Sequence, residues 1–401
     1  MTAAAPGLLG GVRVIEIGSM VAGPVAATLL GDFGAEVIKV EQPRGGDPIR
    51  HSGPMVKGES LWFNVEGRNK RSVTLDLRQP RGQQILRELV VHADVLIENF
   101  RPGTMAGWNC DYTRLAQVNP RLIMLSISGY GQTGPNAPLA SYDRVALAFA
   151  GFLNATGYAD RPPVRPGFAV ADYQTALYGA FSIMMALYSR DARDGHGQHI
   201  DLSLYETVFR FTEFMITAYD KLGINRERGG NMAAQASPGD HYPTSDGRYL
   251  ALTIAADNVF ARLCTAMGRP ELATDERFAR HAARVQNYFT INCMVAEWIE
   301  SNSVEFVTGN LAQHGVPHSL IYSPAEIVND PHYAARGSIA TMEHPRLGPL
   351  KMPAPVPHFS ATPAPPLRPA PLLGENTQEV LGELLKMSPE DIADLRRAGI
   401  V

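Results

Sequence analysis

One early stretch sets the architecture: Val12-Arg-Val-Ile-Glu-Ile17, then Gly18-Ser-Met-Val-Ala-Gly-Pro24 with an apolar helical segment over 25–32, then Glu36-Val-Ile-Lys-Val-Glu41. The two short runs rich in Val and Ile have the composition of buried strands, and Gly34 ends the helix between them. A strand, a helix and a second strand in so few residues form a βαβ unit, which requires parallel strands joined by a right-handed crossover. The stretch therefore predicts a parallel sheet.

The same alternation of strands and helices continues downstream. Strands are expected over 72–77, 95–98 and 122–128, and helices over 80–91 and 111–119. A long helix over 171–189, a strand over 198–203 and a helix over 204–218 follow. The pattern predicts an α/β fold with a Rossmann-like, doubly wound large domain over 1–205.

The pattern of predicted elements changes in the second half of the chain. We expect a linker over 206–221, a smaller α+β domain over 222–312, and a linker that returns to the large domain over 313–345. The stretch 352–371 is dense in proline, and a final helix follows Leu372-Leu-Gly-Glu-Asn-Thr377. Residues 346–401 are therefore expected to form an extended strap and a helix that complete the large domain.

Composition excludes several classes of protein. The chain has 401 residues, of which 45% are hydrophobic and 19% charged, as in an ordinary globular enzyme. Its net charge of −4 argues against a nucleic-acid partner. Its three cysteines form no CxxC pair, so we expect neither a disulfide framework nor a zinc site.

The start of the chain has neither a basic region nor an apolar core, so we expect no signal peptide and a cytoplasmic location. The most apolar stretch, 171–189, is interrupted by Asp172, Gln174 and Ser182. This composition favours a buried helix over a membrane span, so no membrane partner is expected.

Asp172 is the strongest single candidate for chemistry. It lies in Val170-Ala-Asp-Tyr-Gln-Thr175, where a glycine-containing segment enters the long apolar helix. A carboxylate at the head of a buried helix is unusual, and its unperturbed pKa of about 3.9 predicts that it is ionised near neutrality.

Further candidate loops follow predicted strands, at the edge where α/β folds bind ligands. Gly18–Pro24 lacks both the G-x-G-x-x-G and G-K-[ST] patterns, which disfavours a nicotinamide cofactor. Glu98-Asn-Phe-Arg-Pro-Gly103 offers an arginine for a phosphate and a phenyl ring for a base, although a plain turn explains it equally well. Ser128-Gly-Tyr-Gly-Gln-Thr-Gly-Pro135 permits a close backbone approach. Ala140-Ser-Tyr-Asp-Arg144 places a phenol beside a carboxylate.

These segments, in this order, resemble the family III CoA-transferases, the superfamily of formyl-CoA and carnitinyl-CoA transferases and 2-methylacyl-CoA racemases. The resemblance spans nearly the whole chain, because its segments are collinear. The matching segments are Gly11–Pro24, Ala35–Arg50, Asn69–Leu77, Glu98–Gly103, Asn119–Ile123, Ser128–Pro135, Asp172, Gly195–Ser203, Arg228–Asn231 and Pro371–Thr377.

The resemblance implies an intertwined ring dimer of two identical chains, with coenzyme A as a bound co-substrate and no metal or redox cofactor. It implies that Asp172 is the catalytic nucleophile. The residues that it implies for CoA binding are Met20, Val21, Leu75, Arg78, Asn99, Phe100, Arg101, Tyr142 and Asp143.

The chain departs from the family pattern at two places. Gln42 stands where many members have an arginine that stacks on adenine. The segment 231–238 is bulkier than the glycine run that covers the nucleophile of formyl-type enzymes, which argues against a formyl or oxalate substrate.

The implied reaction moves CoA from an acyl-CoA donor to a carboxylic acid, through acyl-aspartyl anhydrides and an aspartyl-CoA thioester. Succinyl-CoA is the expected donor, and a C4–C6 dicarboxylate such as itaconate, mesaconate, citramalate or glutarate is the expected acceptor. The residues expected to shape the acid pocket are Met20, His51, Tyr142, Arg144, Arg165, Met232, Gln235 and His241.

Two alternatives remain open. Racemisation of a 2-methylacyl-CoA needs an acid and a base on opposite sides of the α-carbon. Racemase relatives carry a histidine before the aspartate that matches Asp143, whereas this chain has Tyr142, a poor base at neutral pH. A non-catalytic CoA-binding protein is the alternative from another class, and the presence of Asp172 argues against it.

Overall fold

The computed structural model describes residues 7–232 and 236–401. The described chain divides into two compact units. The larger unit contains 7–152, 165–224 and 335–401, and the smaller contains 153–164 and 225–334 apart from 233–235. The larger unit carries the candidate loops that follow the parallel strands.

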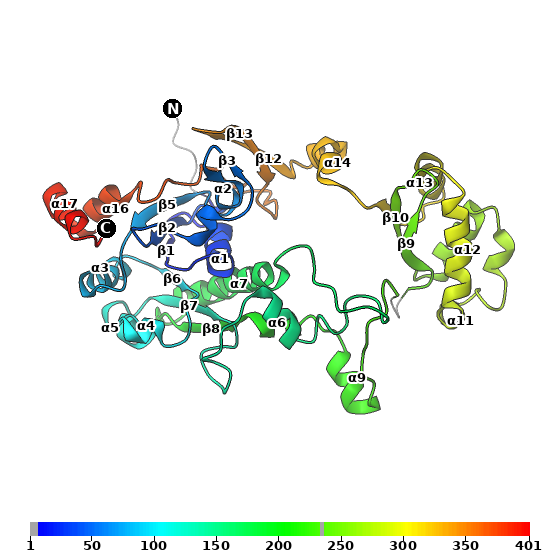
Figure 1. Cartoon of the computed structure of the whole chain (residues 1–401), viewed down its shortest axis with the longest axis horizontal. Helices are drawn as coiled ribbons and strands as arrows, with labels where there is room; N and C mark the ends of the chain where they lie inside the picture. The colour runs from blue at the N-terminus through cyan, green and yellow to red at the C-terminus, as the bar shows by residue number, and fades with distance from the viewer. Residues whose placement is uncertain (1–6, 233–235) are drawn as a thin grey trace. The chain divides into compact units, whose positions relative to one another are not determined.

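A parallel sheet of six strands forms the centre of the larger unit, in the order β5-β2-β1-β6-β7-β8 (Figure 1). Ile15 pairs with Ile38 on one side and with Leu96 on the other. The strand bounds are β1 Arg13–Glu16, β2 Glu36–Glu41, β5 Lys70–Thr74, β6 Val95–Glu98, β7 Ile123–Ser128 and β8 His199–Ser203. The chain adds strands on one side of β1 and then on the other, so the switch point lies between β1 and β6. Ligands bind at the carboxyl ends of strands at such a point.

Helices cover the sheet on both sides, which confirms the doubly wound α/β fold. On one side, a core cluster joins Ile15, Ile38 and Val73 to apolar side chains of the peripheral helices. These helices are α3 Pro80–Val90, α5 Tyr112–Val118, α16 Thr377–Leu385 and α17 Pro389–Arg397. On the other side, α1 (Ala22–Gly31) packs on α7 (Val170–Ala192). Gly179 permits close packing of α7 on β7, because a Cβ there would lie 2.8 Å from the Leu125 side chain.

Local sequence signals explain several helix ends. Pro80 begins α3, where its missing N–H costs no hydrogen bond, and Asp111 caps α5 by accepting a hydrogen bond from the Arg114 N–H. The remaining elements of the larger unit are short. They are η1 Pro48–His51, β3 Met55–Val56, β4 Glu59–Ser60, α2 Leu61–Glu66, α4 Thr104–Gly107, α6 Asp143–Phe149, α8 Leu204–Phe209 and α9 Met215–Leu222, with the hairpin β12 Ile339–His344 and β13 Gly348–Pro353.

The C-terminal strap follows the β5 edge of the sheet. Asn69 and Arg368 exchange hydrogen bonds, with the Arg368 N–H donating to Asn69 Oδ1 at 2.8 Å. Farther along, the Ser72 N–H donates to Asn376 Oδ1 at 3.0 Å. These contacts hold the proline-rich segment against the larger unit, so that α16 and α17 follow it close to the sheet (Figure 1).

The smaller unit has its own core, built on an antiparallel sheet in the order β11-β10-β9. Its elements are β9 Gly239–Pro243, β10 Tyr249–Thr253, α10 Asp257–Ala266, η2 Pro270–Ala273, α11 His281–Gln286, α12 Tyr288–Glu300, α13 Val304–Gln313, β11 His318–Leu320 and α14 Pro324–Asn329, with α15 Pro331–Ala335 at its end. The unit extends past the expected end at 312, because Leu320 of β11 pairs with Leu250 of β10. The expected linker 206–221 contains parts of α8 and α9, both within the larger unit.

Within the described residues, no helix is long and apolar enough to cross a membrane.

Candidate active site

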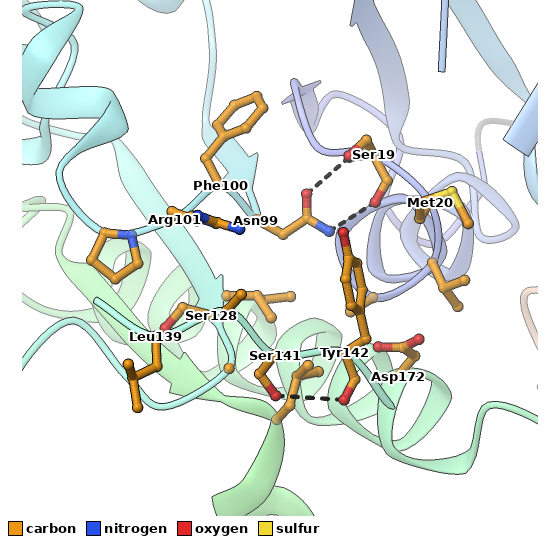
Figure 2. Close-up of a pocket in the computed structure, with 17 residues that line it drawn as sticks. Ser19, Met20, Asn99, Phe100, Arg101, Ser128, Leu139, Ser141, Tyr142 and Asp172 are labelled. Carbon is orange, nitrogen blue, oxygen red and sulfur yellow. Dashed lines mark hydrogen bonds between the residues drawn. The ribbon is translucent and has the colours of Figure 1, made fainter. Parts of the chain in front are cut away.

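The turn after β1 is held in place by side chains from two other segments. The Ser19 N–H donates to Asn99 Oδ1 at 2.8 Å, and Asn99 Nδ2 donates to the Ser19 carbonyl at 2.8 Å (Figure 2). The Met20 N–H donates to Asp47 Oδ1 at 3.0 Å, and Met20 has a positive φ of 65°. Gly18 is required next to this bridge, because a Cβ there would lie 2.9 Å from Asn99 Oδ1. The bridge joins the ends of β1 and β6 across the switch point.

Buried ion pairs support this turn from below. Lys39 Nζ lies 2.8 Å from both Glu16 Oε1 and Asp47 Oδ2, and Lys70 Nζ lies 3.1 Å from Glu16 Oε2. Burial alone would lower the pKa of Lys39, but the carboxylates of Glu16 and Asp47 outweigh it and raise that pKa. Lys39 therefore stays charged and holds Asp47, which in turn holds Met20.

Two cavities open at the carboxyl ends of the strands. The first, of about 250 Å³, lies between the turn after β1, the segment after β6, the end of β7 and the head of α7, and it includes Asp172 (Figure 2). The second, of about 270 Å³, is lined by Gln42, Leu75, Arg78 and Trp108, among others. Ser19 and Phe100 line both, so the two cavities are adjacent and together offer an elongated site.

Asp172 lies in the first turn of α7, and flanking residues fix this helix end on two sides. Asp143 Oδ1 accepts a hydrogen bond from the Ala171 N–H at 2.8 Å. Tyr173 donates its hydroxyl to Glu66 Oε1 at 2.8 Å and accepts a hydrogen bond from Trp62 Nε1 at 3.1 Å. The backbone that carries Asp172 is therefore anchored immediately before and after it.

The Asp172 carboxylate itself has no hydrogen-bond partner among the described residues. Burial, with a smaller contribution from the charge of Asp143, raises the pKa of Asp172 to about 7. Burial and the charge of Asp143 therefore work against the expected full ionisation of this carboxyl near neutrality, because both disfavour its charged form. Asp172 is half-buried, and a partly desolvated carboxylate that accepts no hydrogen bond is a stronger nucleophile than one in water.

The Asn99–Arg101 segment is positioned by Glu98, which is buried at the end of β6. Glu98 Oε2 accepts a hydrogen bond from the Phe100 N–H at 2.7 Å, and Ser126 provides a second hydrogen bond. Burial raises the pKa of Glu98 to about 7 despite these two bonds. One carboxyl group thus holds the backbone at Phe100, a residue that lines both cavities.

A carboxylate nucleophile, an elongated site and a switch-point location fit acyl transfer from a large thioester. The family model for CoA-transferase family III matches residues 9–377. The chain belongs to CoA-transferase family III. The expected family and class of enzyme are therefore confirmed.

Proteins of this family with curated names align along the whole chain. The chain is 42% identical over 397 residues to a succinyl-CoA–D-citramalate CoA-transferase of Chloroflexus aurantiacus, covering 99% of this chain and 98% of the relative. It is 41% identical over 397 residues to the beta subunit of a succinyl-CoA–L-malate CoA-transferase of the same organism, covering 98% of each. A crystal structure of a CAIB/BAIF family protein from Brucella suis superposes with a TM-score of 0.84 at 35% identity, covering 95% of this chain and 100% of that chain.

The residues predicted for CoA binding fall into three groups in this CoA-transferase. Met20, Val21, Asn99, Phe100, Arg101 and Tyr142 line the cavity that contains Asp172. Leu75 and Arg78 line the second cavity together with Phe100. Asp143 is outside both linings and buried, because its carboxylate turns to the head of α7. Asp143 therefore helps to position Asp172 by holding the backbone of the preceding residue, Ala171.

The residues predicted to shape the acid pocket are more scattered. Met20 and Tyr142 line the Asp172 cavity. His51, Arg144 and Arg165 are exposed residues of the larger unit outside that lining. Met232 and His241 belong to the smaller unit, and Gln235 lies outside the described residues, as do parts of the segment 231–238.

The segments Glu98–Gly103 and Ser128–Pro135 were predicted as candidate loops, but sequence reasoning gave no individual role to Asp47, Glu98 or Ser128. Glu98 was available as a signal, because a charged residue that ends a buried strand needs a partner. Asp47 lies in the Gly-Asp-Pro-Ile-Arg segment that carried the family resemblance, but its link to Met20 spans 27 residues and requires the tertiary structure.

Proposed function

We propose that the protein transfers CoA from succinyl-CoA to a C4–C6 dicarboxylic acid, with Asp172 as the nucleophile. The observation that carries the proposal is the anchored, unpartnered Asp172 carboxylate in a cavity adjoining a second one at the switch point. The names of the two Chloroflexus relatives support succinyl-CoA as donor and a dicarboxylate as acceptor. Citramalate, malate, itaconate, mesaconate and glutarate are the acids to test first.

The two cavities accommodate the two ends of CoA in this proposal. The nucleotide end lies in the cavity lined by Leu75 and Arg78, and the thioester lies beside Asp172. Arg78 is largely exposed and pairs with Asp76 at 2.8 Å, so it can turn to a phosphate at little cost. Gln42 lines the nucleotide cavity where many relatives have a stacking arginine, so Phe100 and Trp108 are the aromatic surfaces left for the base.

The first half of the reaction converts Asp172 into a thioester. The Asp172 carboxylate attacks the carbonyl carbon of succinyl-CoA, the carbon–sulfur bond breaks, and a succinyl-aspartyl anhydride and CoA thiolate result. The thiolate then attacks the Asp172 carbonyl carbon and expels succinate, which leaves the aspartyl-CoA thioester. Backbone N–H groups near Gly129 are suitable donors to the transient oxyanions.

The second half of the reaction mirrors the first. The acceptor carboxylate attacks the aspartyl-CoA carbonyl carbon. This attack forms a second anhydride and releases the CoA thiolate. The thiolate attacks the acyl carbon of the acceptor, giving the new acyl-CoA and restoring the Asp172 carboxylate. No net proton is consumed, so an unprotonated Asp172 is needed only at the start and returns at the end.

We further propose that the protein is an intertwined homodimer and that it is cytoplasmic. Large apolar side chains repeat along one exposed side of α7, at Leu177, Phe181, Met185 and Tyr188, the last of which is 73% exposed. Such a stripe on a helix of a globular protein is typical of a protein interface. Light scattering that gives the mass of one 43.6 kDa chain would contradict the dimer.

The function is tested by incubating the protein with succinyl-CoA and each acid in turn, and measuring the acyl-CoA products. Transfer should occur with wild type and be lost in Asp172→Ala, and hydroxylamine should trap a modified Asp172 in the wild type alone. A fully active Asp172→Ala variant would overturn the role of this residue. Deuterium incorporation at the α-carbon of a 2-methylacyl-CoA without any acceptor acid would instead indicate a racemase.

A further inference from the structure

Ser128 is a buried polar residue in the wall of the Asp172 cavity. Ser128 is the last residue of β7 and lines the cavity (Figure 2). It is 8% exposed. No group among the described residues forms a hydrogen bond with its Oγ. Two nearby serines of the same sheet have partners, since Ser126 Oγ lies 2.9 Å from His199 Nε2 and Ser203 Oγ donates to Glu206 Oε2 at 2.6 Å. Ser128 therefore differs from its neighbours.

An unpartnered buried hydroxyl is costly, because it gives up its hydrogen bonds to water without gaining others. The backbone cannot easily move Ser128 out of the cavity wall. Gly129 follows it and packs so closely on Ser141 that a Cβ at Gly129 would lie 2.2 Å from the Ser141 Cβ. The residue is therefore held in the cavity wall, with its Oγ buried and its hydrogen-bonding capacity unused.

Several other polar groups of the cavity have their hydrogen-bonding capacity committed or are open to solvent. The side-chain amide of Asn99 is engaged through both its oxygen and its nitrogen with Ser19, and Ser141 Oγ donates to the Tyr142 carbonyl at 3.5 Å. The side chain of Tyr142 is 75% exposed, and Arg101 is exposed. The Ser128 hydroxyl is both buried and unpartnered, which makes it a candidate partner for a buried polar group of a ligand in this cavity.

The ligand itself indicates which group that is. A CoA thioester with its nucleotide in the Leu75–Arg78 cavity and its carbonyl carbon at Asp172 must thread its pantetheine arm past Ser19 and Phe100, which line both cavities. This arm is aliphatic apart from two amides and one hydroxyl. Ser128 shares its wall with apolar Pro102 and Leu139, a surface suited to such an arm.

We propose that Ser128 forms a hydrogen bond with an amide of the pantetheine arm and thereby sets the position of the thioester relative to Asp172. The inference rests on the proposed function. Because the arm is common to donor and product, Ser128 affects every acyl-CoA equally and does not discriminate among acids.

The test compares the affinities of wild type and Ser128→Ala for two ligands by calorimetry. CoA contains the arm, whereas 3′-phospho-ADP is its nucleotide half alone. Ser128→Ala should weaken CoA binding roughly tenfold and leave 3′-phospho-ADP binding unchanged, because the variant loses one buried hydrogen bond to the arm. The ligand-free variant should melt no lower than wild type, since it no longer buries an unpartnered hydroxyl. Ser128→Thr keeps the hydroxyl and should bind CoA more tightly than Ser128→Ala.

Unchanged CoA affinity in Ser128→Ala would overturn the proposal, and so would equal weakening of both ligands. Kinetics give a second measurement. The KM for succinyl-CoA should rise in Ser128→Ala while the KM for the acceptor acid stays constant. A rise confined to the KM for the acid would also overturn the proposal. A wild-type protein that neither binds CoA nor transfers it would instead refute the proposed function.

Discussion

Asp143 Oδ1 lies 2.8 Å from the backbone nitrogen of Ala171 and accepts its hydrogen bond. Ala171 lies in the first turn of α7, directly before Asp172. The contact satisfies one of the N–H groups that a helix leaves unpaired in its first turn. It also brings a second carboxylate close to Asp172, and this charge adds to burial in raising the pKa of Asp172 to about 7. Asp143 thus combines a structural task with an electrostatic one.

The first prediction concerns the pH dependence of transfer. Because only the ionised Asp172 can attack, kcat/KM for succinyl-CoA should rise as the pH increases through about 7 and level off above about 8. Initial rates between pH 5 and 9 measure this limb. A rate that is constant from pH 5 to 8 would show that the free enzyme holds Asp172 ionised throughout.

Asp143 provides a matched pair of variants. Asp143→Asn retains an oxygen that can accept the Ala171 N–H but removes the charge, so the acid limb of the pH profile should move to lower pH. Asp143→Ala removes the cap as well, and kcat should fall by about tenfold as the helix head loosens. If Asp143→Asn and Asp143→Ala have the same rates across the pH range, the hydrogen bond to the Ala171 N–H does not contribute to transfer.

Replacement of Asp172 should change stability in a pH-dependent manner. A buried acid whose folded pKa exceeds its unfolded value costs no stability below pH 4, and the cost grows as the pH rises to about 7. Asp172→Asn removes a cost of up to about 4 kcal/mol at pH 8. Urea unfolding should therefore show a stabilised variant at pH 8 and little difference at pH 4.5. Equal effects at both pH values would argue against a buried, uncompensated charge.

Glu98 should affect CoA binding more than chemistry. Glu98→Ala leaves the Phe100 N–H without its acceptor, so the KM for succinyl-CoA should rise several-fold while kcat changes little. Glu98→Gln keeps an acceptor oxygen and should stay close to wild type. A large loss of kcat with an unchanged KM in Glu98→Ala would contradict a role confined to the CoA-binding segment.

Asp47 is expected to be critical for folding of the first turn. Its carboxylate accepts the N–H groups of Met20 and Ile49 and pairs with buried Lys39. Asp47→Ala should destabilise the protein by about 3–5 kcal/mol, as found when one partner of a buried ion pair is removed. Urea unfolding measures this, and Asp47→Asn, which keeps an acceptor oxygen, should lose less.

Some of the site was predictable from the sequence because its signals are local. The order of strands and glycine-containing turns placed Met20, Asn99 and Phe100 at one edge of a parallel sheet, and they line the Asp172 cavity. The helix expected over 171–189 is α7, Val170–Ala192. Such elements follow from short-range periodicity, which a single sequence reveals directly.

Other assignments could not be made from the sequence. Asp143 was expected at the thioester, but its carboxylate turns to the head of α7, a choice made by a contact over 28 residues. The end of the smaller unit depended on β11, whose three residues gain their strand character by pairing with β10. Neither relation leaves a local signal.

The sequence alone determined the parallel α/β fold, the family resemblance and the candidacy of Asp172, since these depend on periodicity and on collinear motifs. The tertiary structure alone decided the raised pKa of Asp172 and the contacts of Asp143 and Glu98. A pKa depends on burial and on charges that are distant in the chain, and a hydrogen bond depends on which groups the fold brings within about 3 Å.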